Sequence, residues 1–354
     1  MRLERLTPGH APPAGLVGAV LPRDVRVAGD RWAKGRRLSA EDLEQLVGDA
    51  AAFPDGHPLS VLVLEPGDLH EDEAANRLAA AVAGPGLVSR GPIQSRVDLL
   101  AAHSGVVHVR TAALERVNRI DPLEVFTVFD GQVVESGDLV ASVKVAPHVV
   151  AESVLEDAER LARHARSIVR VARFVPARVG VVVSERVAGA ARERFERSVR
   201  DKVERLGSTV VAIDYVADSP AAVEGAIAAL SRGRGRGRGR ASLILTAGAR
   251  STDPSDPFFV AIAALGGSVV RRGVPAHPGS MLWLARVGRT AILGLPTCGA
   301  YSKATAADLV LPRLLSGEPA SARTVAQLGH GGILTRDMRF RFPAYARDLD
   351  APEG

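Results

Sequence analysis

The segment LTAGARSTDPSD, residues 245–256, combines small residues with two carboxylates. Small residues let backbone N–H groups approach an anion closely, and a following helix adds its positive end. Asp253 and Asp256 carry oxygen ligands of the kind that suits a Mg²⁺ ion bridging to a phosphate. Asp and Ser are equally typical of a helix N-cap, where a side-chain oxygen accepts a backbone N–H group. The residue types alone leave both interpretations open.

Two further segments have similar loop chemistry. VPAHPGSMLW, residues 274–283, contains a Pro-Gly turn in which His277 suits an anion donor or, as we favour, a structural turn residue. LGLPTCGAYSKATAADL, residues 293–309, places small residues before a helix, so the amides of 297–299 are candidates for anion contact. Cys298 has no histidine near it in sequence, and we expect no nucleophilic role for it.

The second half of the chain alternates strands and helices that must position these loops. The patterns predict strands at 179–183, 208–214, 242–246 and 268–273, helices at about 189–206, 218–230 and 256–265, two strands joined at Gly288 within 281–296, and a helix over 301–317. This alternation indicates a three-layer α/β/α sandwich around a mostly parallel sheet. Ligands bind at the carboxyl ends of such strands, where the three loops are expected.

The first half predicts a smaller, mixed α+β region rich in strands. Residues 39–42 resemble a capping box, and 70–84 predict a helix whose acidic first turn is better explained by the helix dipole than by a metal. Branched residues predict a strand at 59–65, and alternation over 123–147 predicts a hairpin with Asp130-Gly131 as its turn. The expected domains are 1–170 (mixed region), 171–320 (α/β domain) and 321–354 (C-terminal tail).

The positive charge of the chain comes from one segment. The 354 residues contain 45 Lys and Arg against 40 Asp and Glu, and five of the arginines lie in the Arg-Gly repeat at 232–240. The repeat has no aromatic residue for base stacking and connects a predicted helix to a strand, at the sheet edge opposite the ligand loops. We expect a solvated surface loop; an RNA-binding or anion-binding role is the alternative, and nucleic acid is not expected to be the main partner.

Cysteine content and hydropathy indicate the cellular compartment in which the chain is expected. A single cysteine excludes a disulfide framework. The start of the chain lacks an apolar signal-peptide core, and no run approaches the ~18 apolar residues of a membrane helix. We therefore expect a cytoplasmic protein without a membrane segment.

Taken in order, the three loops resemble one family. Residues 176–318 are similar to the molybdopterin-binding domain of the molybdenum-insertion enzymes of the MoeA/gephyrin type and their small MogA/MoaB relatives. The similarity lies in three segments that occur in the same order: ILTAGARSTDPSD, LGGSVVRRGVPAHPGSMLWLARVGRTAILGLP and CGAYSKATAADLVLPRLLSGEP. The family's Thr-Gly-Gly turn corresponds to 246–248, its Pro-Gly loop to 278–279 and its Leu-Pro-Gly loop to 295–297. In the first half, RLSAEDLEQL, HEDEAANRLA, GPIQSRVDLLAAHSGVVHV and GQVVESGDLVASVKVAP resemble a shorter subgroup of molybdopterin-binding proteins.

The resemblance implies a ligand and its contacts. The ligand is molybdopterin, a pterin dithiolene with a terminal phosphate, or its adenylylated form, in molybdenum cofactor biosynthesis or handling. The implied binding residues are Thr246, Ala247, Gly248, Ser251, Pro278, Gly279, Ser280, Pro296, Thr297, Gly299 and Lys303. Asp253 and Asp256 are the implied catalytic and metal-binding residues, and Glu185 is a third catalytic candidate. The resemblance further implies Mg²⁺ and molybdate for an insertion reaction, and a homo-oligomer, either a dimer or a trimer.

The chain departs from the family pattern in several places, among them the acidic loop, which Arg250 and Ser251 lengthen, and the shortened N-terminal domains. Ala247 replaces the second glycine of the turn, which is tolerable only with a negative φ. The early Thr-Gly-Asp-Glu motif is reduced to Val-Ser-Glu-Arg at 183–186, which weakens the case for catalysis more than the case for binding. Molybdenum insertion, a non-catalytic carrier or sensor, and nucleotide pyrophosphate hydrolysis as in CinA-like proteins therefore stay open.

Overall fold

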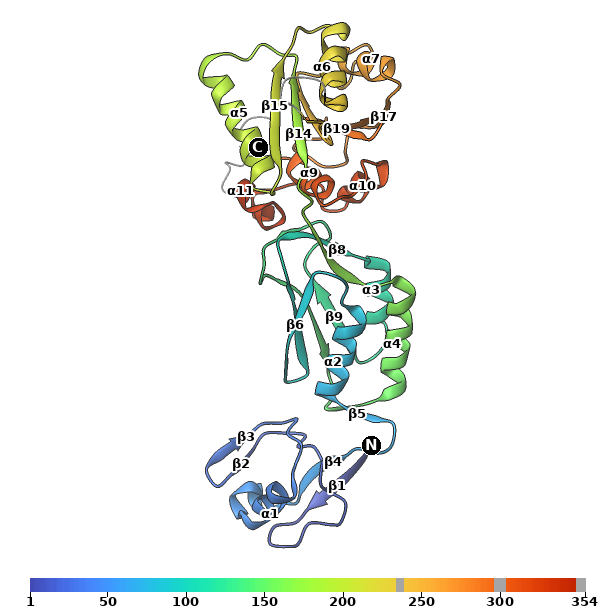
Figure 1. Cartoon of the computed structure of the whole chain (residues 1–354). Helices are drawn as coiled ribbons and strands as arrows, with labels where there is room; N and C mark the ends of the chain where they lie inside the picture. Colours follow the sequence, from blue (N-terminus) through green and yellow to red (C-terminus); the bar gives the residue numbers. More distant parts are fainter. Residues whose placement is uncertain (234–238, 296–303, 348–354) are drawn as a thin grey trace. The chain divides into compact units, whose positions relative to one another are not determined.

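The computed structural model describes residues 1–233, 239–295 and 304–347 (Figure 1). The chain divides into two compact units. The first comprises Met1–Ala102, Val109–Val128 and Gly137–Arg170. The second comprises His103–His108, Phe129–Ser136 and the chain from Val171 onward. Two short pieces of the first half therefore belong to the unit formed by the second half.

The first unit begins with a small strand and helix assembly. β1 (Arg2–Leu6) pairs antiparallel with β4 (Leu59–Val63), which confirms the predicted strand, and β2 (Val25–Val27) pairs with β3 (Asp30–Trp32). α1 (Ala40–Gly48) starts with the predicted capping box between Ser39 and Asp42. Leu6, Leu46 and Leu59 are fully buried in a core that these elements share.

A four-stranded antiparallel sheet forms the rest of the first unit. Its order is β6 (Leu87–Ile93), β7 (Arg96–Ala101), β11 (Leu139–Val145) and β9 (Leu123–Thr127). α2 (Glu71–Val82), the predicted second helix, packs on this sheet, with α3 (Thr111–Asn118) and α4 (Glu152–Ala165) beside it. β5 (Asp68–His70) and β12 (Val149–Ala151) pair antiparallel where α2 and α4 begin. The strand-rich mixed region is thus as predicted.

The predicted hairpin over 123–147 is partly wrong. β9 and β11 do pair antiparallel, but Asp130-Gly131 is not the turn that joins them. The intervening segment 129–136 belongs to the second unit, where β10 (Val133–Val134) pairs with β8 (Gly105–Val109). Alternation in sequence shows that two strands exist, but it cannot show that the chain leaves the sheet between them.

The second unit is built on a six-stranded sheet. The order is β15 (Thr209–Tyr215), β14 (Arg178–Val183), β16 (Leu243–Ala247), β19 (Thr290–Gly294), β18 (Trp283–Val287) and β17 (Ser268–Arg272). The first four strands are parallel, and β18 is antiparallel to both of its neighbours. β18 and β19 are the two predicted strands joined at Gly288.

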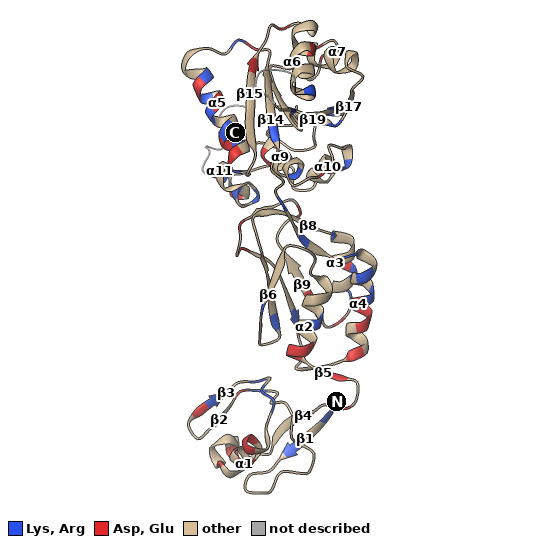
Figure 2. Cartoon of the chain, in the orientation of Figure 1, with Lys and Arg blue, Asp and Glu red and all other residues tan. Residues whose placement is uncertain are grey.

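Helices cover both faces of this sheet, so the predicted three-layer α/β/α sandwich is confirmed. Val181, Leu245 and Leu293 face α5 (Gly189–Glu204) and α9 (Ala307–Leu315). The residues next to them along the strands, Val182, Ile244 and Ile292, point to the other face. There they face α6 (Pro220–Arg232) and α7 (Pro257–Ala264). Positive and negative side chains are interspersed along α5 (Figure 2). No helix among the described residues is long and apolar enough to cross a membrane.

The segment after α9 packs into the second unit. α10 (Ala322–Ala326) and α11 (Ala344–Arg347) contribute Val325, Tyr345 and Ala346 to the same core as α5 and α9. Residues 330–334 also pair with the loop before β18, where His277 N donates to Gly332 O at 2.7 Å. The described part of 321–347 is therefore continuous with the α/β core.

Candidate functional site

Three loops meet at one edge of the six-stranded sheet. β14, β16 and β19 are parallel neighbours, so the chain leaves all three at the same carboxyl edge. Trp283, the first residue of the antiparallel β18, is paired with Gly294, the last residue of β19. The loop that precedes β18 therefore lies at this edge too. The described segments gathered here are the first loop, 248–256, the Pro-Gly loop, 273–282, and the segment after β14, 184–188; the third loop, which follows β19, is described only at its two ends.

Gly248 packs directly against the loop after β14. It has a φ of +97°, and a Cβ atom added to it would lie 2.8 Å from Glu185 N and 2.8 Å from Ser184 Oγ. Ser184 N donates to Ala247 O at 3.1 Å, which ties the two loops together at their bases. Both the backbone conformation and the close approach require glycine at position 248.

The two residues before Gly248 end strand β16. Ala247 is buried and does not have a positive φ, so the condition under which alanine can replace the family's second glycine is met. Thr246 is fully buried; its carbonyl accepts Leu295 N at 2.9 Å, and its Oγ1 has no partner among the described residues. The third loop therefore begins beside the first.

Glu185 lies half-buried next to Gly248. Its Oε1 is buried and has no hydrogen-bond partner among the described residues. Burial raises the pKa of this carboxyl above its ordinary value, because the charged form is poorly solvated there. Glu185 is thus, like Thr246, a candidate whose side chain keeps a polar atom without a partner among the described residues.

Asp256 serves as the N-cap of α7. It is 1% exposed, its Oδ1 accepts Phe258 N at 2.9 Å, and its Oδ2 accepts Arg250 N at 2.7 Å. The side chain of Arg250 in turn pairs with Asp218, in the loop after β15, at 3.2 Å. Both oxygens of Asp256 therefore hold backbone amides, and the N-cap interpretation describes the geometry of this residue.

The two aspartates do not fit a Mg²⁺ site. The carboxylate of Asp253 accepts the backbone N–H and hydroxyl of Ser255 at 2.8 and 2.6 Å, contacts that lower the pKa of its carboxyl. Together with the occupied oxygens of Asp256, this leaves no pair of free carboxylates. No group of three or more His, Cys, Asp or Glu residues suited to a metal ion occurs within residues 1–233, 239–295 and 304–347. Ser251 lies half-buried in the turn that precedes Asp253.

The Pro-Gly loop contacts the start of α9. Gly279 has a φ of +104°, and a Cβ atom there would lie 2.8 Å from Ala306 N and 3.0 Å from Thr305 Cβ. Ala306 N also donates to Pro278 O at 2.9 Å, and Ser280 O accepts Val274 N at 2.9 Å within the loop. The third loop thus starts beside Thr246 and ends beside Gly279. Its predicted binding residues, Pro296, Thr297, Gly299 and Lys303, lie outside the described residues.

Thr305 and Asp308, which hold the end of the third loop, were not predicted from the sequence as site residues. Thr305 N donates to Asp308 Oδ2 at 2.9 Å, and Ala307 N donates to Thr305 Oγ1 at 3.2 Å. Thr-Ala-Ala-Asp at 305–308 has the spacing of a capping box, a signal that could have located it. Asp308 also forms an ion pair with Lys202 of α5. No local sequence pattern indicates this pairing.

The flanks of the Arg-Gly repeat lie at the opposite edge. Ser242 N donates to Arg178 O at 2.9 Å, so the chain enters β16 beside the first residue of β14. Gly233 is the C-cap of α6. Residues 234–238 lie outside the described residues. The described flanks therefore stand at the amino edge, away from the three loops.

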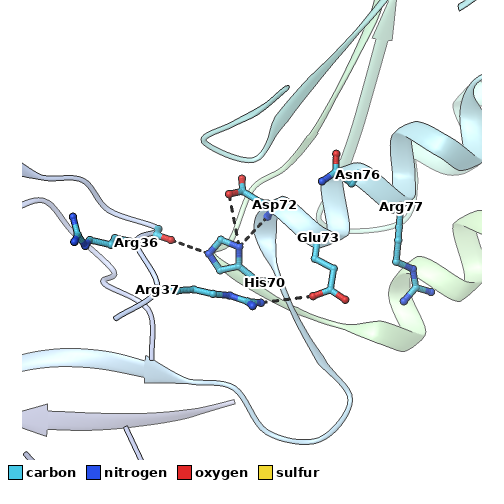
Figure 3. A pocket seen from close by; sticks show the side chains of 8 residues that line it. Arg36, Arg37, His70, Asp72, Glu73, Asn76 and Arg77 are labelled. Carbon is cyan, nitrogen blue, oxygen red and sulfur yellow. Dashed lines mark hydrogen bonds and ion pairs between the residues drawn. The ribbon is translucent and has the colours of Figure 1, made fainter. Parts of the chain in front are cut away.

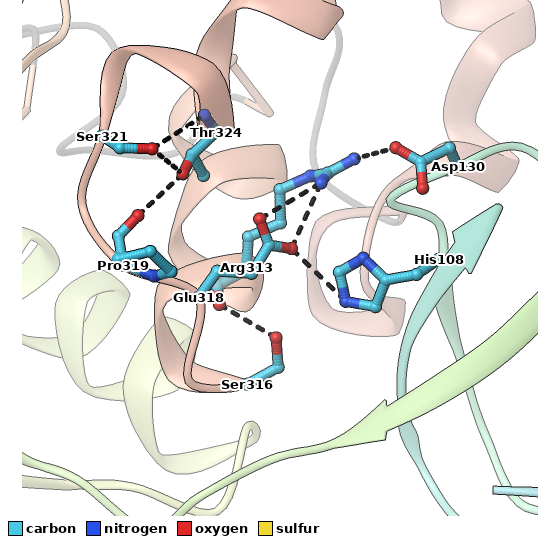
Figure 4. A network of polar contacts seen from close by, with 8 residues as sticks. All are labelled: His108, Asp130, Arg313, Ser316, Glu318, Pro319, Ser321 and Thr324. Atoms are coloured by element: carbon cyan, nitrogen blue, oxygen red, sulfur yellow. Dashed lines mark hydrogen bonds and ion pairs between the residues drawn. The ribbon is translucent and has the colours of Figure 1, made fainter. Parts of the chain in front are cut away.

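A polar network binds the other end of α9 (Figure 4). Arg313, 3% exposed, pairs with Asp130 at 2.6 Å and with Glu318 at 3.1 Å. Glu318 also lies 3.4 Å from His108 Nε2. Asp130 and His108 come from the two first-half pieces that belong to the second unit. Arg313 therefore links those pieces to the helix that follows the third loop.

The first unit contains an open cavity of about 620 Å³ beside α2 (Figure 3). His70 Nε2 contacts Gly35 O at 2.8 Å, and Arg37 pairs with Glu73 at 3.6 Å. Arg77 is held by Glu152 and Glu159 at 2.6 and 2.9 Å. The charges that line this cavity are paired within the unit, and we assign it no ligand.

Comparisons with known proteins bear on the second unit. Residues 179–316 match the family model described as a probable molybdopterin binding domain. Among solved structures, the chain is similar to the molybdopterin biosynthesis moea protein from Pyrococcus horikosii (14% identity, covering 73% of this chain and 80% of that one, TM-score 0.31). It is also similar to molybdenum cofactor biosynthesis protein B (15% identity, 41% and 96% coverage, TM-score 0.29). Comparison with curated proteins finds no match. Residues 179–316 thus match the molybdopterin-binding domain family that the order of their loops resembles.

Proposed function

We propose that the α/β domain binds molybdopterin or its adenylylated form in molybdenum cofactor biosynthesis or handling. The observation that carries the proposal is Gly248 at the carboxyl edge of the sheet, where a φ of +97° and the close approach of Glu185 exclude a side chain. Bare backbone at such an edge suits the phosphate of a pterin ligand, because N–H groups can approach its oxygens. The family match over 179–316 supports a pterin as that ligand.

The proposed contacts divide between the loops. The amides of Gly248 and Ser251 bind the phosphate, with Thr246 and Ala247 setting the end of β16. The Pro278–Ser280 turn lines the far side of the ligand. We retain the expected roles of Pro296, Thr297, Gly299 and Lys303 as part of this proposal.

Glu185 is assigned to binding in this proposal. Burial raises the pKa of its carboxyl, so Glu185 takes up a proton more readily than an exposed glutamate, and a protonated carboxyl can donate a hydrogen bond to a phosphate oxygen. Its buried Oε1 has no partner among the described residues, and the backbone N and Cβ of Glu185 pack against Gly248. Asp253 and Asp256 are engaged with backbone and hydroxyl groups, which favours binding over metal-assisted insertion.

Titration of the purified full chain with molybdopterin and with its adenylylated form tests the proposal. We expect saturable binding of at least one of them. Release of AMP on addition of Mg²⁺ and molybdate would instead identify an insertion enzyme, and hydrolysis of ADP-ribose without pterin binding would identify a pyrophosphate hydrolase. Absence of binding to either pterin overturns the proposal.

The resemblance extends the proposal to assembly and location. It implies a cytoplasmic homo-oligomer, a dimer or trimer, in which the segment from 171 to 320 is the ligand-binding domain. Sedimentation of the purified chain tests the oligomer, because a monomer at every concentration contradicts it. Expression of residues 171–354 tests whether the domain folds without the pieces at 103–108 and 129–136, which the second unit incorporates.

A further inference from the structure

A buried charged cluster lies beneath the loop edge in the second unit. Lys202 on α5 is 2% exposed and Asp308 in the first turn of α9 is 0% exposed, and Lys202 Nζ donates to Asp308 Oδ1 at 2.5 Å. Lys202 Nζ also lies 5.4 Å from the ring centroid of Tyr345 on α11. Burial and the Asp308 carboxylate raise the pKa of the Tyr345 phenol well above its ordinary value. Three helices that are distant in sequence therefore converge on one carboxylate.

Stability alone does not account for this cluster. Two charges removed from water lose their solvation, and apolar residues of similar volume often stabilise a fold as well or better. What an apolar cluster cannot do is accept a hydrogen bond. Asp308 Oδ2 accepts Thr305 N at 2.9 Å, so the carboxylate that Lys202 holds also fixes the residue at which the third loop ends.

The fixed residue touches the Pro-Gly loop. Thr305 Cβ and Ala306 N lie 3.0 and 2.8 Å from the position of a Cβ atom at Gly279. Ala306 N donates to Pro278 O at 2.9 Å. A shift of Thr305 and Ala306 therefore moves the peptide between Pro278 and Gly279, because no space separates them.

We propose that Asp308, held in place by Lys202, is a positioning residue for the pterin site, acting through Thr305 and Ala306 on the Pro278–Gly279 loop. The proposal rests on the proposed function, since it assigns the cluster to that ligand. Asp308 does not touch the ligand. It holds the Pro-Gly loop and the end of the third loop at a fixed distance from each other, so that a rigid, phosphate-bearing pterin contacts both at the same time.

Two double variants isolate the hydrogen bond to Thr305. Lys202→Met with Asp308→Leu removes both charges and the acceptor, whereas Lys202→Met with Asp308→Asn removes both charges but keeps an acceptor for Thr305 N. We expect the Leu variant to bind molybdopterin roughly tenfold more weakly than wild type, in line with the effect of small misplacements in binding sites. We expect the Asn variant to bind within about threefold of wild type. Equal affinities for the two variants overturn the proposal.

Hydrogen exchange gives a second measurement that does not depend on ligand affinity. In the ligand-free chain, peptides that contain 278–280 and 304–308 should exchange faster in the Leu variant than in the Asn variant, while peptides from β14 and β16 stay unchanged. Uniform exchange across these peptides contradicts the positioning role even if wild type fails to bind molybdopterin. Failure of wild type to bind contradicts the proposed function alone. If the Leu variant does not fold, exchange at 304–308 in wild type must slow on addition of molybdopterin; no change overturns the proposal.

Discussion

Trp283 occupies the space that a side chain at Gly294 would fill. The two residues are paired across β18 and β19, and a Cβ atom at Gly294 would lie 2.0 Å from Trp283 Cε2 and 2.1 Å from its Nε1. The indole is 1% exposed and also packs edge-on against Phe259, with ring centroids 5.1 Å apart. The glycine thus fixes the aromatic core beneath the start of the third loop.

Gly294→Ala is therefore expected to destabilise the second unit. A methyl group here overlaps a buried indole that has no room to move, and overpacking of this kind costs up to about 3 kcal/mol. Urea denaturation followed by Trp fluorescence measures the loss. The matched control is Gly225→Ala in α6, where nothing lies within 4 Å, and there we expect a gain of about 0.5–1 kcal/mol. If Gly294→Ala leaves the free energy of unfolding unchanged, the two strands separate more easily than the packing indicates.

Gly248→Ala tests the ligand edge. The new methyl group collides with Glu185 N and Ser184 Oγ, so we expect molybdopterin affinity to fall at least about tenfold with a loss of stability of about 1–2 kcal/mol. Gly207→Ala is the matched control, because Gly207 also has a positive φ, +74°, but has nothing within 4 Å and lies after α5. It should lose similar stability and no affinity. Calorimetric titration and thermal melts separate the two effects, and undiminished binding by Gly248→Ala counts against the proposed edge.

Glu185→Gln tests the environment of the half-buried carboxyl. Its pKa in the folded chain is raised above the ordinary value of 4.5, so the contribution of Glu185 to stability is complete below that value and is lost as the pH rises through the raised one. The Gln variant does not titrate. We expect its melting temperature relative to wild type to be higher at about pH 8 than at about pH 4. A difference that does not change with pH contradicts the assigned burial.

Arg313→Met tests the link between α9 and the first-half pieces. The change leaves Asp130 and Glu318, whose side chains are 19% and 18% exposed, without the guanidinium that they share. Breaking such a buried arrangement costs about 3 kcal/mol. Arg31→Met, which removes the exposed pair with Asp24, should cost much less, because solvent screens this pair. Chemical denaturation compares the two, and equal losses would remove Arg313 from the structural role assigned here.

The Arg-Gly repeat offers a charge test of the ligand edge. Replacing Arg234, Arg236 and Arg238 with Ser removes three positive charges from the segment that follows α6. Because the described flanks of the repeat lie at the amino edge, molybdopterin affinity should stay within about twofold of wild type. A larger fall in affinity, sensitive to salt, would mean that the repeat contacts the anion directly.

The sequence by itself determined the sandwich and the edge at which its loops gather. The period of apolar residues along β14, β16 and β19, and the helices between them, require a parallel sheet buried on both faces. A parallel sheet brings the loops that follow these strands, such as the one at Gly248, to one edge. Local residue types also predicted the turn at Gly288 and the capping box at Ser39.

Only the tertiary structure decided how individual polar groups are used. Asp256 has the same local sequence whether it binds a cation or caps a helix, and only the folded positions of Arg250 and Phe258 show that its oxygens are occupied. Asp308 and Lys202 are 106 residues apart, and Arg313 and Asp130 are 183 apart. Sequence periodicity reports the neighbours of a residue along the chain, whereas the partner of a buried charge is set by long-range packing, which no local pattern encodes.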